Sequence, residues 1–132
     1  MAKRFSIIQN PTFKQVAKIP RIGGDPIEVE FTYKYLTRPQ LTEMNDAWHK
    51  AKIELLEGWE KAREEGTLAS HDMNEGETTF NVNQLKDILV GWAFDEEFND
   101  ENIRALVETS IGATDAVIGA YNDAYQKAKL GN

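Results

Sequence analysis

The side chains that most often do chemistry in proteins are few in this chain. There are two histidines, His49 and His71, and no cysteine. His49 falls within a helical pattern and His71 in a polar stretch, so neither has partners at metal-ligand or catalytic-triad spacing. The serines lie outside any Gly-x-Ser-x-Gly turn, and the phosphate-binding loop and Gly-x-Gly-x-x-Gly motifs are missing. We therefore predict no nucleotide chemistry, no metal site, no catalytic residue and no cofactor.

The acidic stretch 95–101 (DEEFNDE) is the one cluster of side chains that could bind a cation or move a proton. A calcium loop that began at Asp95 would need glycine at its sixth position and glutamate at its twelfth. These positions hold Asp100 and Leu106, so the pattern fails. Paired carboxylates can also act as general acid and base. We interpret the cluster as solvated charge at the start of a helix, and contact with a partner and catalysis remain the alternatives.

Charge and composition narrow the classes of partner. The 132 residues carry a net charge of −7. Residues 1–36 hold six basic and three acidic side chains, whereas residues 66–132 hold four basic and twelve acidic ones. An acidic body disfavours nucleic-acid binding, because phosphate neutralisation needs clustered Lys and Arg. The basic front and acidic back could also favour head-to-tail association between copies.

No export or membrane signal is visible. Residues 1–10 lack the apolar core of a signal peptide. The longest apolar runs are about four residues, against the ~18–20 that span a bilayer. Without cysteine, a reducing setting is the simplest expectation. We predict a soluble single domain, 1–132, that binds no membrane.

Strand signals are concentrated near the N-terminus. In residues 27–35 (IEVEFTYKY) apolar and polar side chains alternate without a fault, which is typical of a half-buried antiparallel strand. A less regular alternation precedes it, with Gly-Gly-Asp-Pro between the two as a turn. We predict a β-hairpin over about 12–35. Because a two-stranded ribbon is only marginally stable, its aromatic face must pack on helices or on a neighbouring copy, and the candidate self-assembly residues are Phe31, Tyr33 and Tyr35.

Helical patterns fill most of the remaining chain. Apolar residues recur at spacings of three and four from Leu41 to Ala62, which predicts a helix over about 39–65 with Pro39 in its first turn. Residues 67–79 follow Gly66, are polar and acidic, and contain a further glycine at position 76, so we predict a mobile loop there. Further helices are expected within 82–129: one from about 82 to 90 that Gly91 ends, one after Asn99, and one after Gly112. The predicted class is α+β, mainly helical, with about four helices.

Aromatic side chains are the best candidates for a binding surface. A short turn holds three rings close together in the sequence, and one of them could stay exposed. The last predicted helix combines small residues with tyrosines, which favours close packing of another helix. The candidate partner-binding residues are therefore Trp92, Phe94, Phe98, Tyr121 and Tyr125. The alternative is that these rings pack into the core.

An ordered set of segments resembles one known family. It comprises the hairpin Gly-Gly-Asp-Pro-Ile-Glu-Val-Glu-Phe-Thr-Tyr-Lys, then Leu-Thr-Arg at 36–38, Asp-Ile-Leu-Val-Gly-Trp at 87–92, the acidic and aromatic turn with Phe98-Asn99, and a closing helix around Ala120-Tyr121. Together these segments resemble the tail assembly chaperones of long-tailed, siphovirus-type bacteriophages. The resemblance covers about residues 12–128.

The resemblance implies a role without catalysis. Members of that family coat the tape measure protein and keep it soluble, and they leave as tail tube subunits polymerise around it. The resemblance also implies a ring or helical homo-oligomer, a frameshifted longer form of the chain, the host bacterial cytoplasm as location, and absence from the mature virion. Residue chemistry alone identifies no partner, so these implications rest on the resemblance.

Three alternatives remain at the level of sequence. A head-tail connector or tail terminator also forms rings but stays in the particle. A small hydrolase would use the 95–101 cluster. A bacterial regulatory or adaptor domain is the third possibility.

Overall fold

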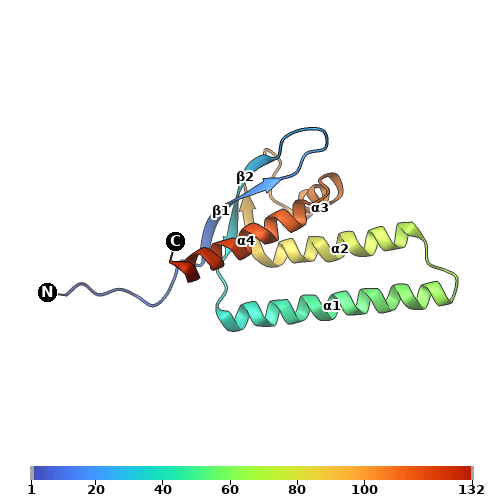
Figure 1. The fold of residues 1–132 in the computed structure, drawn as a ribbon, viewed down its shortest axis with the longest axis horizontal. Coiled ribbons are helices and arrows are strands. Elements are labelled where there is room, and N and C mark those ends of the chain that lie inside the picture. The colour runs from blue at the N-terminus through green and yellow to red at the C-terminus, as the bar shows by residue number, and fades with distance from the viewer. Residues whose placement is uncertain (1, 132) are drawn as a thin grey trace.

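The structure, a computed structural model, describes residues 2–131. Within that range the chain forms four helices and three strands: β1 (Thr12–Ile19), β2 (Ile27–Lys34), α1 (Arg38–Glu64), α2 (Ser70–Ile88), β3 (Leu89–Trp92), α3 (Asp100–Thr109) and α4 (Ala113–Leu130). The predicted α+β class with an N-terminal hairpin is confirmed. Figure 1 shows the sheet with α4 across it, a long hairpin of α1 and α2 that runs to one side, and an extended N-terminal segment on the other.

The sheet has three strands in the order β1-β2-β3, all antiparallel to their neighbours. The β1–β2 register places Phe13 opposite Tyr33 and Ala17 opposite Val29, so the inward side chains of both strands share a face. The third strand was not predicted. Gly91, expected to end a helix, lies opposite Thr32 within β3, because pairing with β2 takes these residues out of the helical pattern.

The molecule has two layers, with helices on one face of the sheet and solvent on the other. The buried face of the sheet meets inward side chains of α2, α3 and α4, and the fully buried large residues are Ile19, Phe31, Tyr33, Leu85, Ile88, Ile103, Val117 and Tyr121. The opposite face holds Lys14, Lys18 and Glu30 in solvent, with Lys14 and Glu30 3.8 Å apart. The hairpin thus acquires its stability from helices of the same chain.

The hairpin of α1 and α2 replaces the predicted loop at 67–79. That prediction is wrong, because α2 begins at Ser70 and only a short turn separates the helices. Two contacts with neighbouring helices help to hold the polar first half of α2: the Arg104 guanidinium lies 2.6 Å from the Glu75 carboxylate, and Lys52 lies 3.9 Å from Glu77. The helix predicted over 82–90 is therefore the second half of a longer one.

The boundaries of the other helices follow their capping residues. Thr37 caps α1 in a capping box, with its hydroxyl accepting from the Gln40 amide and the Gln40 side chain accepting from the Thr37 amide. Asn99 caps α3 through the Asn102 amide. Gly112 adopts a positive φ of 87° just before α4. Across residues 2–131, none of the helices combines the length and apolar character that a membrane crossing needs.

Candidate functional site: an aromatic groove

Tyrosines fix α4 against the end of β2 and the segment that leads into α1. The Tyr33 hydroxyl donates to the Val117 carbonyl at 2.8 Å. The Tyr121 hydroxyl donates to the carbonyl of Lys34 at 3.0 Å. Because inward residues of a strand alternate and those of a helix recur every three or four positions, the two patterns bring these rings together.

Tyr125 binds the same segment one turn further along α4. Its hydroxyl accepts from the Leu36 amide at 2.8 Å and donates to the Leu36 carbonyl at 3.0 Å. The ring stacks on Tyr35 with the centroids 6.1 Å apart. Leu36 lies two residues before α1 begins, so Tyr125 holds the helical hairpin to the body of the molecule.

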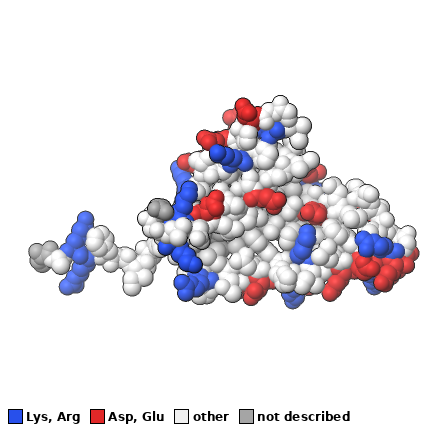
Figure 2. All heavy atoms as spheres, in the orientation of Figure 1, with Lys and Arg blue, Asp and Glu red and all other residues white. Residues whose placement is uncertain are grey.

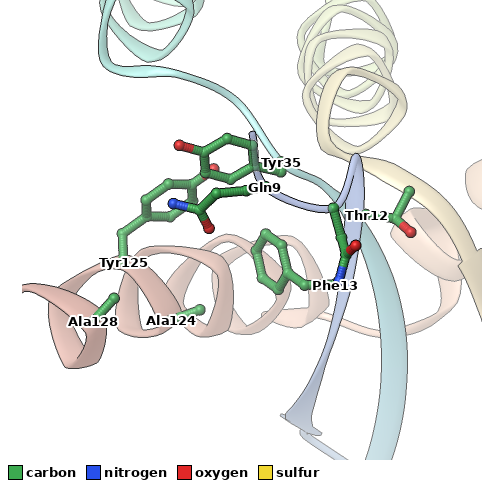
Figure 3. A pocket seen from close by; sticks show the side chains of 8 residues that line it. Gln9, Thr12, Phe13, Tyr35, Ala124, Tyr125 and Ala128 are labelled. Carbon is green, nitrogen blue, oxygen red and sulfur yellow. The ribbon is translucent and has the colours of Figure 1, made fainter. Parts of the chain in front are cut away.

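An open groove of about 330 Å³ lies beside these rings. Its aromatic wall is formed by Phe13, Tyr35 and Tyr125, and Figure 3 shows Ala124 and Ala128 on the same side of α4 as Tyr125. Gln9, Asn10 and Thr12 complete the lining at the root of the N-terminal segment. Aromatic rings offer large apolar area, and two alanines let another backbone come close. The groove can therefore accept an apolar side chain of a partner.

Burial governs the electrostatics behind the groove. It raises the pKa of Tyr33 above its ordinary value, because the charged phenolate would lose its hydration. Burial also raises the pKa of Tyr121, and the Tyr125 hydroxyl oxygen, 3.3 Å from that of Tyr121, adds to the effect. Both phenols are therefore neutral at physiological pH and serve as hydrogen-bond donors. The groove is set up for binding, with no activated nucleophile among these residues.

Comparison with protein families decides the general role. The family described as phage tail assembly chaperone matches residues 1–132, the whole chain. The chain belongs to this family. The resemblance drawn from the ordered sequence segments is confirmed. No curated protein and no solved structure gives a match.

Of the candidate partner-binding residues of this tail assembly chaperone, the structure brings two together near the groove. Tyr125 lines it, and Tyr121 lies behind it, 5.1 Å from Tyr125 between ring centroids. Tyr121 is only 1% exposed, so its prediction as a contact residue is corrected to a supporting role in the core.

The other three candidates form a separate aromatic cluster. Trp92 meets Phe94 and Phe98 edge-on, each at 5.1 Å between centroids, and its indole N–H donates to the Glu96 carbonyl at 2.8 Å. Phe94 also packs edge-on against the buried Phe31. All three rings are half-buried, so their use by a partner stays a prediction.

The candidate self-assembly residues need a correction. Phe31 and Tyr33 are 0% exposed, because α4 and the 92–98 turn cover the aromatic face of the sheet that was expected to be open to a second copy. Tyr35 is half-buried and stacked on Tyr125. Phe31 and Tyr33 are therefore closed to contact with another molecule.

The acidic stretch 95–101 lies in solvent around the start of α3. Its carboxylate-bearing residues are exposed, and Asp100 lies 3.1 Å from the Lys86 ammonium. Within residues 2–131 no group of three metal-ligating side chains gathers anywhere. Acidic residues in a first helical turn interact favourably with the helix dipole, which accounts for Asp100 and Glu101.

Sequence reasoning missed the lining residues Phe13, Ala124 and Ala128. Ala124 and Ala128 lie three and seven positions after Tyr121, on one column of α4. Phe13 belongs to the inward set of the first strand. A column of small residues beside tyrosines was a visible signal for a groove, but its second wall came from a strand more than 100 residues earlier.

Proposed function

We propose that this tail assembly chaperone binds the tape measure protein of its phage and keeps it soluble until tail tube subunits assemble around it. Family membership supports the general role. The observation that carries the finer proposal is the open aromatic groove, which offers an apolar binding site without reactive groups. An elongated, partly apolar helix aggregates through its exposed side chains, and a groove of this kind covers them.

The groove fits helical side chains better than a small soluble metabolite. Its volume of about 330 Å³ suffices for one or two large apolar side chains. The alanines at 124 and 128 permit a second helix to approach α4 closely. The proposal therefore places apolar residues of the tape measure protein against Phe13, Tyr35 and Tyr125.

Further parts of the proposal follow from the chaperone role. The chain acts in the host bacterial cytoplasm, helps recruit the tail tube protein, assembles with itself and with a frameshifted longer form, and is absent from the mature virion. Mass spectrometry of purified virions separates this proposal from a connector or terminator, because a structural protein remains in the particle at stoichiometric amounts.

Co-expression with the tape measure protein tests the groove. Ala128→Trp fills the groove from an exposed position, and Asn122→Trp adds the same ring to α4 at a position that does not line the groove. We expect the soluble fraction of the tape measure protein to fall with Ala128→Trp and to stay at the wild-type level with Asn122→Trp. Equal soluble fractions for both variants would contradict a role for the groove. An insoluble tape measure protein in the presence of wild type would contradict the chaperone role itself.

We also infer that the chain is not an enzyme. A chaperone family supports this inference, as does the exposure of the 95–101 carboxylates. The double variant Asp95→Asn, Glu97→Gln should solubilise the tape measure protein as well as wild type. Removal of a general acid or base typically lowers a reaction rate ~10²–10⁴-fold. A comparable loss of the solubilising activity in the double variant would therefore contradict the inference that the chain is not an enzyme.

A further inference from the structure

The N-terminal arm, defined as residues 2–10, carries apolar side chains that the rest of its own chain does not cover. Phe5, Ile7 and Ile8 are 81%, 98% and 86% exposed, and the arm is neither helix nor strand. Figure 1 shows it extending away from the body on the side opposite the α1–α2 turn. Burial of such a side chain gains about 1.5–3 kcal/mol, so an uncovered set of three favours a contact with another molecule.

Basic charge accompanies these apolar residues. Lys3 and Arg4 precede Phe5, and the Lys3 ammonium lies 5.4 Å from the centre of the Phe5 ring. The arm contains no acidic residue. Its partner surface should therefore be apolar with acidic side chains beside it.

The outer face of α1 has this chemistry. Ile53 and Leu56 are 41% and 48% exposed, although they are large and apolar. Glu57, Glu60 and Glu64 continue the same face at helical spacing, and among residues 2–131 only Glu60 of these three has an ion pair, with Arg63 at 2.8 Å. Figure 2 shows acidic side chains gathered at the end of the molecule where the α1–α2 turn lies, with some basic ones beside them, and basic side chains on the arm at the other end.

Within one chain, Ile7 of the arm cannot reach Leu56 on this face. The Tyr35 amide donates to the Pro11 carbonyl at 2.8 Å, so the arm and α1 start from nearly the same place. Ile7 lies four residues from Pro11, a reach of about 14 Å when extended. Leu56 lies twenty residues beyond Leu36, about 30 Å along a helix. The contact between Ile7 and Leu56 can therefore form only between two copies.

We propose that the arm of one copy docks on the outer face of α1 of the next copy. Phe5, Ile7 and Ile8 cover Ile53 and Leu56, while Lys3 and Arg4 pair with Glu57 and Glu64. The arm projects beyond one end of the long axis and the patch lies in the second half of α1, toward the other end, so they are different surfaces. Such a head-to-tail contact repeats from copy to copy and builds a ring or a helical array.

The aromatic groove is a poorer receptor for the arm. The last turn of α4 beside it carries Lys127 and Lys129, which repel Lys3 and Arg4. The groove thus remains available to another partner when the arm is docked, and the proposal does not rest on binding of the tape measure protein.

Disulfide trapping between full-length chains tests the contact, because the wild-type chain has no cysteine. Ile7→Cys protein is mixed with Leu56→Cys protein and oxidised, and the mixed disulfide dimer is followed on a non-reducing gel. Ile22→Cys serves as the matched control, since Ile22 is 89% exposed and lies on the β1–β2 turn. We expect the disulfide between Ile7→Cys and Leu56→Cys to form at least about tenfold faster than the disulfide between Ile7→Cys and Ile22→Cys.

A charge exchange supplies the second measurement. Lys3→Glu with Arg4→Glu should slow the trapping of Ile7→Cys with Leu56→Cys, and Glu57→Lys with Glu64→Lys on the partner should restore it. Equal rates for the Leu56 and Ile22 partners, or faster trapping with Ala128→Cys in the groove, would overturn the proposal. The arm contact rests on the proposed self-assembly and not on binding of the tape measure protein; neither assay contains that protein, so failure here leaves the proposed binding in the aromatic groove standing.

Discussion

Tyrosine hydroxyl groups connect three parts of the molecule at the scale of single residues. Tyr33 and Tyr121 bind backbone carbonyls on either side of the contact between β2 and α4, and Tyr125 binds both backbone groups of Leu36. A buried donor left without a partner costs about 1–3 kcal/mol, so the carbonyls and phenols must stay paired. The same tyrosine that holds the start of the helical hairpin also lines the groove.

Alkaline pH should destabilise the fold through two of these tyrosines. The unfolded chain ionises a tyrosine near pH 10, whereas the raised pKa values keep Tyr33 and Tyr121 neutral to higher pH when folded. Above about pH 10 the unfolded state therefore holds fewer protons, and the free energy of unfolding falls as pH rises. The slope is at most about 1.4 kcal/mol per pH unit for each group.

Urea unfolding between pH 9 and 11 measures this slope. The double variant Tyr33→Phe, Tyr121→Phe should be less stable at pH 8 and should lose stability less steeply above pH 10. An unchanged slope in the variant would contradict the role assigned to the two phenols.

Tyr125→Phe should loosen the junction between sheet and hairpin while leaving the ring in the groove. The change removes both hydrogen bonds to Leu36, and we expect a loss of about 1–3 kcal/mol in the free energy of unfolding. Amide hydrogen exchange should accelerate at Leu36 but stay slow at Tyr33, within β2. Uniform acceleration at both amides would show global destabilisation instead.

At the scale of elements, sequence patterns predicted the second half of α2 as a helix but missed its first half. The apolar periodicity and the first-turn proline predicted both ends of α1 within one residue, and Asn99 predicted the start of α3. The first half of α2 has no strong apolar stripe, and it is held by contacts with α1 and α3, such as the Arg104–Glu75 pair. β3 was missed for the same reason, since pairing with β2 overrides its local preference. Local patterns do not contain such contacts between distant segments.

Two glycines should respond in opposite ways to the same substitution in the α1–α2 hairpin. A Cβ at Gly76 would lie 2.7 Å from Leu55 Cδ1 and 3.5 Å from Trp59 Nε1, whereas nothing lies within 4 Å of one at Gly58. Gly58→Gln should therefore stabilise the fold by about 0.5–1 kcal/mol through helix propensity. Gly76→Gln gains the same propensity but overpacks the helix contact, which typically costs about 1–3 kcal/mol.

Thermal unfolding of the two variants gives the comparison directly. We expect a higher midpoint than wild type for Gly58→Gln and a lower one for Gly76→Gln. A rise for both variants would mean that the side chain of Leu55 moves aside easily and that Gly76 is not needed for close packing of the hairpin.

At the scale of the whole molecule, charge and shape are polarised along one axis. The sequence already indicated a basic N-terminal part and an acidic C-terminal part. The structure places the basic arm and the acidic end of the α1–α2 hairpin on opposite sides of the molecule (Figure 2). The groove itself was only half predictable. Tyr125 and its helix were identified, but Phe13 joins them through a chain reversal that sequence spacing does not encode.

Self-association should weaken as salt rises, if charge pairs guide the contact between copies. The distance over which charges act falls from about 10 Å at 0.1 M salt to about 3 Å at 1 M. Light scattering over a range of protein concentrations should give a smaller mean mass at 1 M salt. A larger mass at high salt would indicate a contact made by apolar surface alone.

Hydrogen exchange with and without the tape measure protein tests the central claim most directly. We expect slower exchange at β1 near Phe13, at Tyr35 and over the last two turns of α4, with α3 unchanged. Protection confined to the Trp92–Phe98 turn, or no protection at any amide, would contradict binding of the tape measure protein in the aromatic groove.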